Sequence, residues 1–114
     1  MYIYFRTRQL EKVCNKEVEA IKKHGPILAK KLQRRLSELK AAETLADMST
    51  LPNARCHELI GDRAGQLSVD VEHPQRLIFI PANEPIPMKE DGGLDWDNIT
   101  EIEIIEIGDP HPRK

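Results

Sequence analysis

The sequence predicts an α+β fold in which an N-terminal strand and a helical hairpin pack on a twisted, mostly antiparallel sheet, in the order β-α-α-β-β-β-β. Apolar residues recur with a helical period in the first half of the chain and alternate with polar residues in the second half. The chain has 114 residues, the length of one ordinary domain. We therefore expect residues 1–114 to form a single domain.

The first half begins with a short strand and a helix. Residues 2–5 (YIYF) are aromatic or β-branched, which favours a strand, and Thr7 after them is a suitable helix N-cap. From Arg8 to about His24, apolar residues recur at helical spacing among lysines and glutamates, which predicts one amphipathic helix. Its apolar stripe consists of Leu10, Val13, Cys14, Val18 and Ile21.

A second helix follows directly. Gly25 is suited to the left-handed position after a helix and Pro26 to the first turn of the next one, so these two residues separate the helices. The second helix is expected to run to about Thr44, and the short turn makes the pair an antiparallel hairpin. Its buried stripe is expected to consist of Leu28, Leu32, Leu36 and Leu39.

The second half predicts four strands, separated by turns that contain glycine or proline. The strands are expected over residues 55–59, 66–71, 76–80 and 99–107. The 81–98 connection is long for so small a domain, and we expect an ordered functional loop that Trp96 pins to the body. The helices should cover one face of the sheet and leave the other free for a site.

The composition indicates a soluble folded protein and excludes several classes. Charged residues make up 32% of the chain, and no apolar run approaches the length of a membrane span. The N-terminus lacks a signal-peptide pattern, so a cytoplasmic protein with no membrane partner is expected. Aromatic residues make up only 4%, which disfavours a protein that stacks bases on an aromatic platform.

The net charge of −2 hides a division of charge between the two halves. Residues 1–57 hold 12 basic and 6 acidic side chains, whereas residues 58–114 hold 5 and 13. Such asymmetry indicates nucleic acid or an oppositely charged partner, with solvated helix faces as the ordinary alternative.

No strong catalytic motif for phosphate binding, dinucleotide binding or zinc hydrolysis is present, and no cofactor is expected. Cys14 and Cys56 form no CxxC pair, and both are interpreted as small core residues rather than reactive thiols. His57, Asp109 and His111 have no metal-ligand spacing, so no metal site is predicted.

Polar residues on the predicted strands and after the last strand are the candidates for chemistry. His57, Arg63 and Arg76 come from the strands and their turns, and Asp109 and His111 follow the last strand. Histidine suits proton transfer and arginine suits a phosphate, so the set holds the groups that RNA cleavage by 2′-hydroxyl attack requires. The ordinary alternatives are a cross-strand histidine, arginines that are solvated or paired with acidic neighbours, and a frayed tail.

These segments resemble the RelE/ParE superfamily of type II toxins and, within it, the HigB-like killer-protein group. The resemblance covers nearly the whole chain and rests on the element order, on HELIGDRAGQLSVD and HPQRLIF, and on a terminal D-P-H where the group has D-Y-H. It implies a RelE-like fold and a ribosome-dependent mRNA endonuclease, or mRNA interferase. A HigA-like helix-turn-helix antitoxin is the implied partner, and operator DNA would be contacted only through it.

By position, the resemblance assigns proton transfer to His57 and His111, an orienting role to Asp109, and the scissile phosphate to Arg63 and Arg76. The ribosome and its mRNA are the implied partners, and basic residues of the helical hairpin are expected to meet ribosomal RNA. These residues are Lys22, Lys23, Lys30, Lys31, Arg34 and Arg35.

The chain departs from the group at several positions. Pro110 replaces the tyrosine of the tail motif, Gln66 and Leu67 stand where many relatives carry aromatic residues, and the acidic loop 84–97 is long for the fold. Two other functions therefore stay open: a ParE-like inhibitor of DNA gyrase, and a catalytically degenerate module that only binds its antitoxin.

Overall fold

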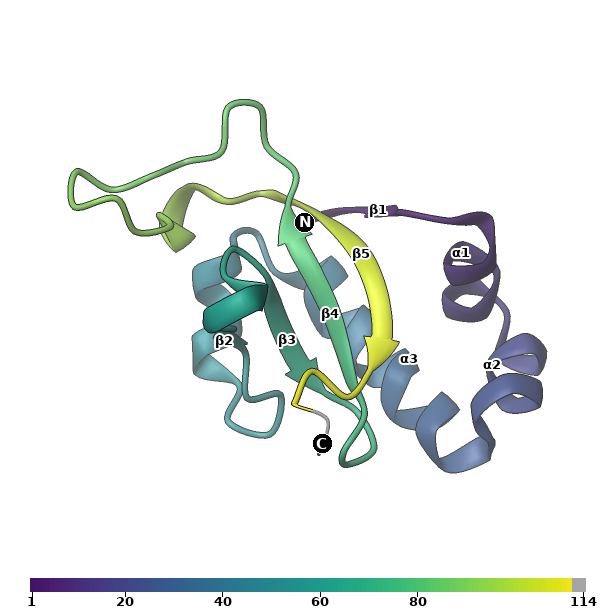
Figure 1. Ribbon diagram of the computed structural model, residues 1–114. Helices are drawn as coiled ribbons and strands as arrows, with labels where there is room; N and C mark the ends of the chain where they lie inside the picture. The colour runs from purple at the N-terminus through teal and green to yellow at the C-terminus, as the bar shows by residue number, and fades with distance from the viewer. Residues whose placement is uncertain (112–114) are drawn as a thin grey trace.

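The computed structural model describes residues 1–111 (Figure 1). They form an α+β fold in which three helices precede most of a five-stranded sheet. The helices are α1 (Arg8–Asn15), α2 (Glu17–His24) and α3 (Pro26–Ala41). The strands are β1 (Tyr2–Phe5), β2 (His57–Glu58), β3 (Leu67–Asp70), β4 (Arg76–Pro81) and β5 (Glu101–Gly108). Short 3-10 turns lie at η1 (Leu45–Thr50), η2 (Gly61–Arg63) and η3 (Trp96–Asn98).

The strands follow the order β1-β5-β4-β3-β2 across the sheet. β1 pairs in parallel with β5, whereas the other pairs are antiparallel, so β2 to β5 form a meander. The predicted mostly antiparallel sheet is therefore confirmed. β1 lies at one edge beside the last strand of the chain, and the two-residue β2 lies at the other, much shorter than the strand predicted over residues 55–59.

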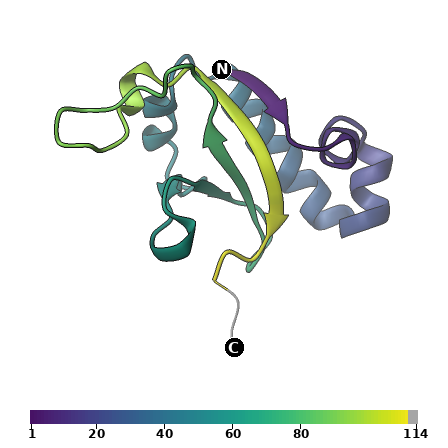
Figure 2. The same ribbon diagram turned by 45° about the horizontal axis from the view of Figure 1, so that its top comes forward.

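All three helices lie on one face of the sheet, and the segment that carries η2 lies on the other (Figures 1 and 2). Strand residues that point toward the helices are fully buried and join the helix residues in one core. The strand members of this core are Leu67, Val69, Leu77, Phe79, Ile102 and Ile104. The face away from the helices, called the open face below, is free of helices but not bare, because Ser68 and Ile78 at its centre are fully buried. The prediction of a free face therefore holds only in part.

The first predicted helix is broken at Lys16, whose φ of −125° and ψ of 111° lie outside the helical region. The predicted apolar stripe ends at Cys14, because beyond the break Val18 and Ile21 are 71% and 38% exposed. Ala20 is fully buried instead, and α2 packs on α3 through this small side chain. A tertiary contact has overridden the helical spacing, which is why one long helix was the wrong prediction.

The start of the second helix is as predicted, and its end comes slightly early. Gly25 has a φ of 85°, and Pro26 occupies the first turn of α3. Leu28, Leu32 and Leu39 are buried, while α3 ends at Ala41 rather than near Thr44. Within residues 1–111, no helix combines the length and apolar character needed to cross a membrane.

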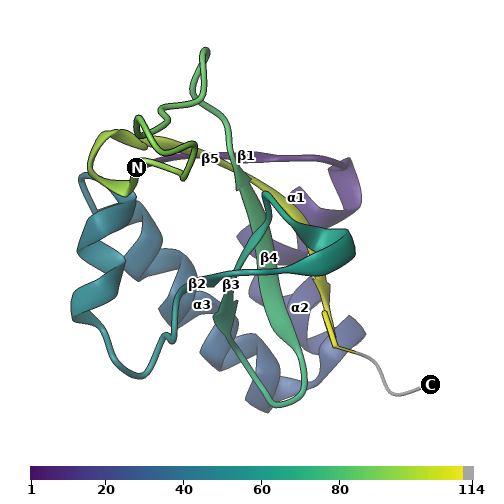
Figure 3. The same ribbon diagram turned by 60° about the vertical axis from the view of Figure 1, so that its left-hand side comes forward.

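The long connection between β4 and β5 projects beyond the sheet, at the upper left of Figures 1 and 3. It is held by internal hydrogen bonds, including one from the Asp95 N–H to the Pro87 carbonyl at 3.0 Å. The Trp96 indole N–H donates to the Glu58 carboxylate at 2.9 Å, and the ring packs against the core. The prediction that Trp96 pins this loop is therefore confirmed.

Candidate functional site

Cross-strand pairing gathers the candidate residues on the open face. His57 of β2 pairs with Ser68 of β3, Ser68 with Ile78 of β4, and Ile78 with Glu106 of β5. These four residues form one row across the face, because residues directly opposite in a sheet point to the same side. The neighbouring row contains Asp70 and Arg76, paired across β3 and β4, followed by Gly108 of β5.

Glu106 reaches the open face because of a bulge in β5. Ile104 pairs with Phe79 and Glu106 pairs with Ile78, so Ile105 is an extra residue between two successive pairs. If Ile105 were a regular strand residue instead of a bulge, strict alternation would turn Glu106 toward the core face together with Ile104. The bulge therefore places the carboxylate of Glu106, rather than the apolar side chain of Ile105, opposite Ile78 on the open face.

His57 and Arg76 are in direct contact. The guanidinium NH1 of Arg76 lies 3.2 Å from Nε2 and 3.4 Å from Nδ1 of His57, and it also donates to the Ser68 hydroxyl at 3.2 Å. The Arg76 side chain is only 13% exposed. The two predicted site residues are thus brought together, with the guanidinium at the base of the site.

Two charged residues continue this contact. Oδ1 of Asp70 lies 3.4 Å from NH1 of Arg76, without hydrogen-bond geometry, and its Oδ2 lies 3.5 Å from the guanidinium of Arg55. The expected pairing of Arg76 with an acidic neighbour is therefore present in addition to its contact with His57. Because Arg76 is shared between a carboxylate and an imidazole, it is held in position from two sides.

Arg63, the second predicted phosphate ligand, stands at the end of η2 on the same face. It donates to the Gln66 side-chain oxygen at 2.6 Å and to the Glu106 carboxylate at 2.7 Å. The ion pair ties η2 to β5 across the open face. Arg63 thus contacts the last residue of the row that begins at His57, and none of the hydrogen bonds of residues 1–111 joins Arg63 to His57 directly.

The tail residues approach the site without completing it. Gly108 pairs with Arg76, and the chain continues as a turn in which the His111 N–H donates to the Asp109 carboxylate at 2.9 Å. Pro110 is buried and His111 is exposed. In the part of the chain that the structure describes, no hydrogen bond or ion pair joins Asp109 or His111 to the histidine and arginines of the sheet.

Arg35 corrects the predicted RNA-facing set of the helical hairpin. It is 7% exposed and donates to the carbonyls of Asp70 and Asn53, each at 2.8 Å, and to the Glu38 carboxylate at 2.9 Å. The prediction places Arg35 on a surface that meets RNA, but this residue connects α3 to the sheet. It is therefore not available to meet RNA.

The other five residues of that set are exposed on α2 and α3. Lys31 is paired with Glu72 at 2.7 Å, and Lys22 lies 3.9 Å from Glu19. Lys23, Lys30 and Arg34 have no ion pair within residues 1–111. Positive charge is thus present along the hairpin, on the face of the sheet opposite to His57.

Neither cysteine has the environment of a nucleophile. Cys14 is buried in the core, and Cys56 is partly buried against it. Burial raises the pKa of both thiols to about 12, helped at Cys56 by the nearby Glu58 carboxylate. Residues 1–111 also contain no group of three side chains suited to holding a metal ion.

Both thiols are accordingly expected to resist alkylation by iodoacetamide at pH 8, because only about 10⁻⁴ of each is thiolate when the pKa is about 12. Mass spectrometry of the folded protein should find little adduct after a time that fully labels the urea-unfolded chain. Rapid labelling of folded Cys56 would contradict this description of its surroundings.

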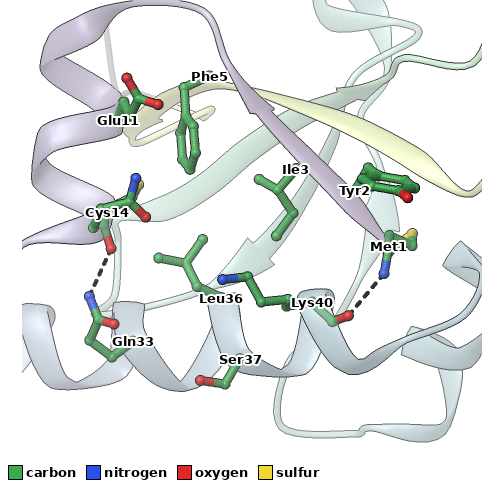
Figure 4. Close-up of a pocket in the computed structure, with 11 residues that line it drawn as sticks. Met1, Tyr2, Ile3, Phe5, Glu11, Cys14, Gln33, Leu36, Ser37 and Lys40 are labelled. Carbon is green, nitrogen blue, oxygen red and sulfur yellow. Dashed lines mark hydrogen bonds between the residues drawn. The ribbon is translucent and has the colours of Figure 1, made fainter.

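A cavity of about 700 Å³ lies away from His57, between β1, α1 and α3 (Figure 4). Ile3 and Phe5 of β1 line it opposite Leu36 and Lys40 of α3, with Cys14 of α1 at one end. Polar and apolar atoms both contribute to its walls. The position fits a groove for a partner better than a centre for proton transfer, because the titratable site residues are all on the opposite face.

Sequence reasoning did not single out Ser68, Glu106 or Arg55. Ser68 is fully buried beneath Arg76, and nothing in its local sequence distinguishes it from an ordinary strand serine. Glu106 had a signal, because the alternation of EIEIIEI is interrupted by a double isoleucine that marks the bulge. Arg55 is distinguished by its backbone conformation, with a φ of 47°, which cannot be inferred from the residue type.

No protein-family model and no curated protein sequence matches the chain. Solved structures are similar to it. A YoeB/ParE toxin from Agrobacterium tumefaciens matches 97% of this chain and 100% of its own, with a TM-score of 0.54 and 11% identity.

Two structures from Staphylococcus aureus are similar as well. A YoeB-YefM complex matches with a TM-score of 0.54 and 13% identity, and a YoeB dimer matches with 0.53 and 15%. Each match covers 95% of this chain and 94% of the other. At such identities the similarity is one of fold, and it does not distinguish a HigB-like subgroup. The chain therefore has the α+β fold of these YoeB and YoeB/ParE toxin structures.

Proposed function

We propose that the protein is the toxin of a type II toxin-antitoxin system and acts as a ribosome-dependent mRNA endonuclease. The observation that carries this proposal is the contact of His57 with Arg76 on the open face of a YoeB/ParE-like fold. A proton acceptor beside a nearly buried guanidinium is the pair that 2′-hydroxyl attack on a phosphodiester needs. The cytoplasm is its proposed location.

In the proposed reaction, Nε2 of His57 accepts the proton of the 2′-hydroxyl while that oxygen attacks the adjacent phosphorus. The P–O5′ bond breaks, leaving a 2′,3′-cyclic phosphate and a 5′-hydroxyl end. Before substrate binds, the Arg76 guanidinium lies against the imidazole, with NH1 3.2 Å from Nε2 and 3.4 Å from Nδ1. A phosphate held by this guanidinium would place the adjacent 2′-hydroxyl close to Nε2.

Arg63 is proposed to hold the developing negative charge on the phosphate oxygens. Its guanidinium is already bound by Gln66 and Glu106, so the RNA phosphate has to displace or share the carboxylate. His111 is proposed to protonate the departing 5′-oxygen, with Asp109 orienting it. Three residues of chain span at most about 10 Å, which keeps His111 within reach of Gly108 and hence of the strand partner of Gly108, Arg76.

The antitoxin is proposed to bind the groove beside β1. Tyr2 and Arg6 direct their N–H groups to β5, so the backbone groups of Ile3 and Phe5 point away from the sheet, and both residues line the groove. An unpaired strand edge next to a cavity suits an extended peptide. A HigA-like helix-turn-helix protein would supply this segment and would alone contact operator DNA. The S. aureus complex shows a YoeB bound to YefM.

Ribosome binding is proposed to use the exposed basic residues of the hairpin, led by Lys23, Lys30 and Arg34. Their attraction to ribosomal RNA would weaken with salt. The acidic loop over residues 84–97 is held away from this surface by the Trp96–Glu58 hydrogen bond. The acidic loop, which would repel RNA, is thus kept apart from the basic residues of the hairpin.

A catalytically degenerate antitoxin-binding module is the second candidate. Two observations favour it: Arg63 is occupied by Glu106, and Pro110 is buried where a tyrosine of the tail motif would supply a ring. In that case the groove beside β1 would keep its role while the open face had none.

Expression without an antitoxin is expected to arrest growth, and primer extension on cellular mRNA is expected to find cuts at codon-linked positions. Arg76→Ala should relieve the arrest, because it removes the charge that stabilises the transition state. Lys40→Ala, a substitution in the groove, serves as a matched control that keeps the arrest. DNA damage signalling without cuts would indicate a gyrase inhibitor, and normal growth with a folded protein would indicate the degenerate module.

A further inference from the structure

Arg55 has a left-handed backbone, with a φ of 47°. Among residues 1–111 every other residue with a positive φ is a glycine. Left-handed backbone is unfavourable for a residue with a side chain, and it persists only where the surroundings enforce it. Such a conformation two residues before a candidate proton acceptor points to a role in placing that acceptor.

The conformation is enforced from both sides of Arg55. Before it, the Ala54 carbonyl accepts from the Asp70 N–H at 2.8 Å, and the Asn53 carbonyl accepts from Arg35 at 2.8 Å. After it, β2 begins at His57, which pairs with Ser68 of β3. The chain must turn sharply between two anchored points, and Arg55 is the residue that makes this turn.

The turn aims the Arg55 carbonyl at the imidazole of His57. The carbonyl oxygen lies 2.9 Å from Nδ1. Since a carbonyl only accepts hydrogen bonds, Nδ1 must carry the proton in this contact. In the neutral ring, the lone pair is then on Nε2. NH1 of Arg76 lies 3.2 Å from Nε2 and 3.4 Å from Nδ1, so the guanidinium lies over the ring and leaves the in-plane lone pair free. The backbone of Arg55 thereby selects the tautomer of His57.

The side chain of Arg55 contributes much less. It is 65% exposed, and within residues 1–111 its one ion pair is with Asp70 at 3.5 Å. Exposed ion pairs at this distance have small effects. The geometry therefore separates two properties of one residue, an unusual backbone that contacts His57 and an ordinary surface charge that does not.

We propose that Arg55 is a positioning residue for the mRNA cleavage proposed above, acting through its left-handed backbone to hold His57 with Nδ1 protonated and Nε2 free to accept a proton. The expected effect on cleavage rests on the proposed function. The effect of Arg55 on the tautomer of His57 can be measured without RNA.

The test compares substitutions that differ in their tolerance of left-handed backbone. Arg55→Gly removes the charge and keeps the conformation at no steric cost, and Arg55→Asn is nearly as tolerant. Arg55→Val removes the same charge and strongly disfavours the left-handed conformation. Arg55→Ala disfavours it less, so it can replace the valine variant in the comparison if that variant unfolds. Circular dichroism establishes that each variant is folded.

Two readouts are measured on each variant. Two-bond ¹H–¹⁵N spectra of ¹⁵N-histidine protein at high pH, where the ring is neutral, report which nitrogen of His57 carries the proton. We expect Nδ1–H in the original protein and in the glycine and asparagine variants, and a shift toward Nε2–H in alanine and valine. Codon-linked cleavage should stay within about two-fold in Arg55→Gly and fall at least ten-fold in Arg55→Val.

The outcomes are distinguishable from failure of the proposed function. If Arg55→Gly loses as much as Arg55→Val, the charge is the important property and the proposal is overturned. It is also overturned if a folded Arg55→Val keeps the original tautomer and cleavage. The remaining outcome is that the protonated nitrogen of His57 changes across the variants as expected, while the original protein cuts no mRNA. In that case the positioning role of Arg55 is supported and the nuclease proposal fails.

Discussion

His57→Ala is expected to abolish growth arrest and to lower the rate of mRNA cleavage by about 10²–10⁴-fold, the usual contribution of a general base. His57 is partly exposed at the short strand β2, so its removal should leave the fold intact. Cleavage is measured by primer extension after induction, and folding by thermal melting. The large effect follows because no other imidazole among residues 1–111 contacts Arg76.

A sharper version of this test is His57→Asn. The asparagine amide nitrogen occupies roughly the position of Nδ1 and still donates to the Arg55 carbonyl, but no group remains at the position of Nε2. Loss of cleavage in this variant therefore reports the missing proton acceptor rather than a disturbed strand. His73→Ala, in the exposed turn between β3 and β4, is the matched control and should cut normally. Full activity of His57→Asn would remove this residue from the mechanism.

Much of the fold was predictable because it depends on local patterns. Gly25 and Pro26 separate two helices through backbone preferences that act within a few residues. The alternating runs of the second half predict strands because one face of each is buried. The break at Lys16 was not predictable in this way, since the helical spacing continues through it; the structure instead buries Ala20 and packs α2 on α3.

The candidate site was predictable in its residue types and less so in its geometry. His57, Arg63 and Arg76 lie on the open face, as their strand positions suggested. Their partners depend on register, which is set by the whole sheet rather than by any one strand. The bulge in β5 shows this most clearly, since Glu106 reaches Arg63 on the open face only because Ile105 is bulged rather than paired.

The position of Arg35 explains why counting basic residues overestimates a surface for RNA. Its neighbours on α3, Lys31 and Arg34, are exposed, whereas Arg35 stands three residues after Leu32 and four before Leu39, at the spacing of the buried stripe. The difference arises because Arg35 faces the carbonyls of Asn53 and Asp70, which come from other parts of the chain. Buried carbonyls of this kind need donors, and a guanidinium supplies several from one side chain.

Arg35→Met is consequently expected to lower the free energy of unfolding by about 3–5 kcal/mol, because it leaves the Glu38 carboxylate and two carbonyls without their donor at a site that is 7% exposed. Chemical denaturation measures the change. Arg34→Met, one residue away on the exposed face of α3, is the matched control and should change stability by less than about 0.5 kcal/mol.

The two substitutions also separate structure from RNA binding. Arg34→Met is expected to weaken binding to the ribosome and to make that binding less sensitive to salt. Arg35→Met should lower ribosome binding only because less of the protein is folded. Because Arg35 holds Asn53, and Asn53 lies just before the turn at Arg55, partial loosening should also disturb the Nδ1 contact of His57. A stable Arg35→Met protein with weakened ribosome binding would reverse this assignment and return Arg35 to the RNA-facing surface.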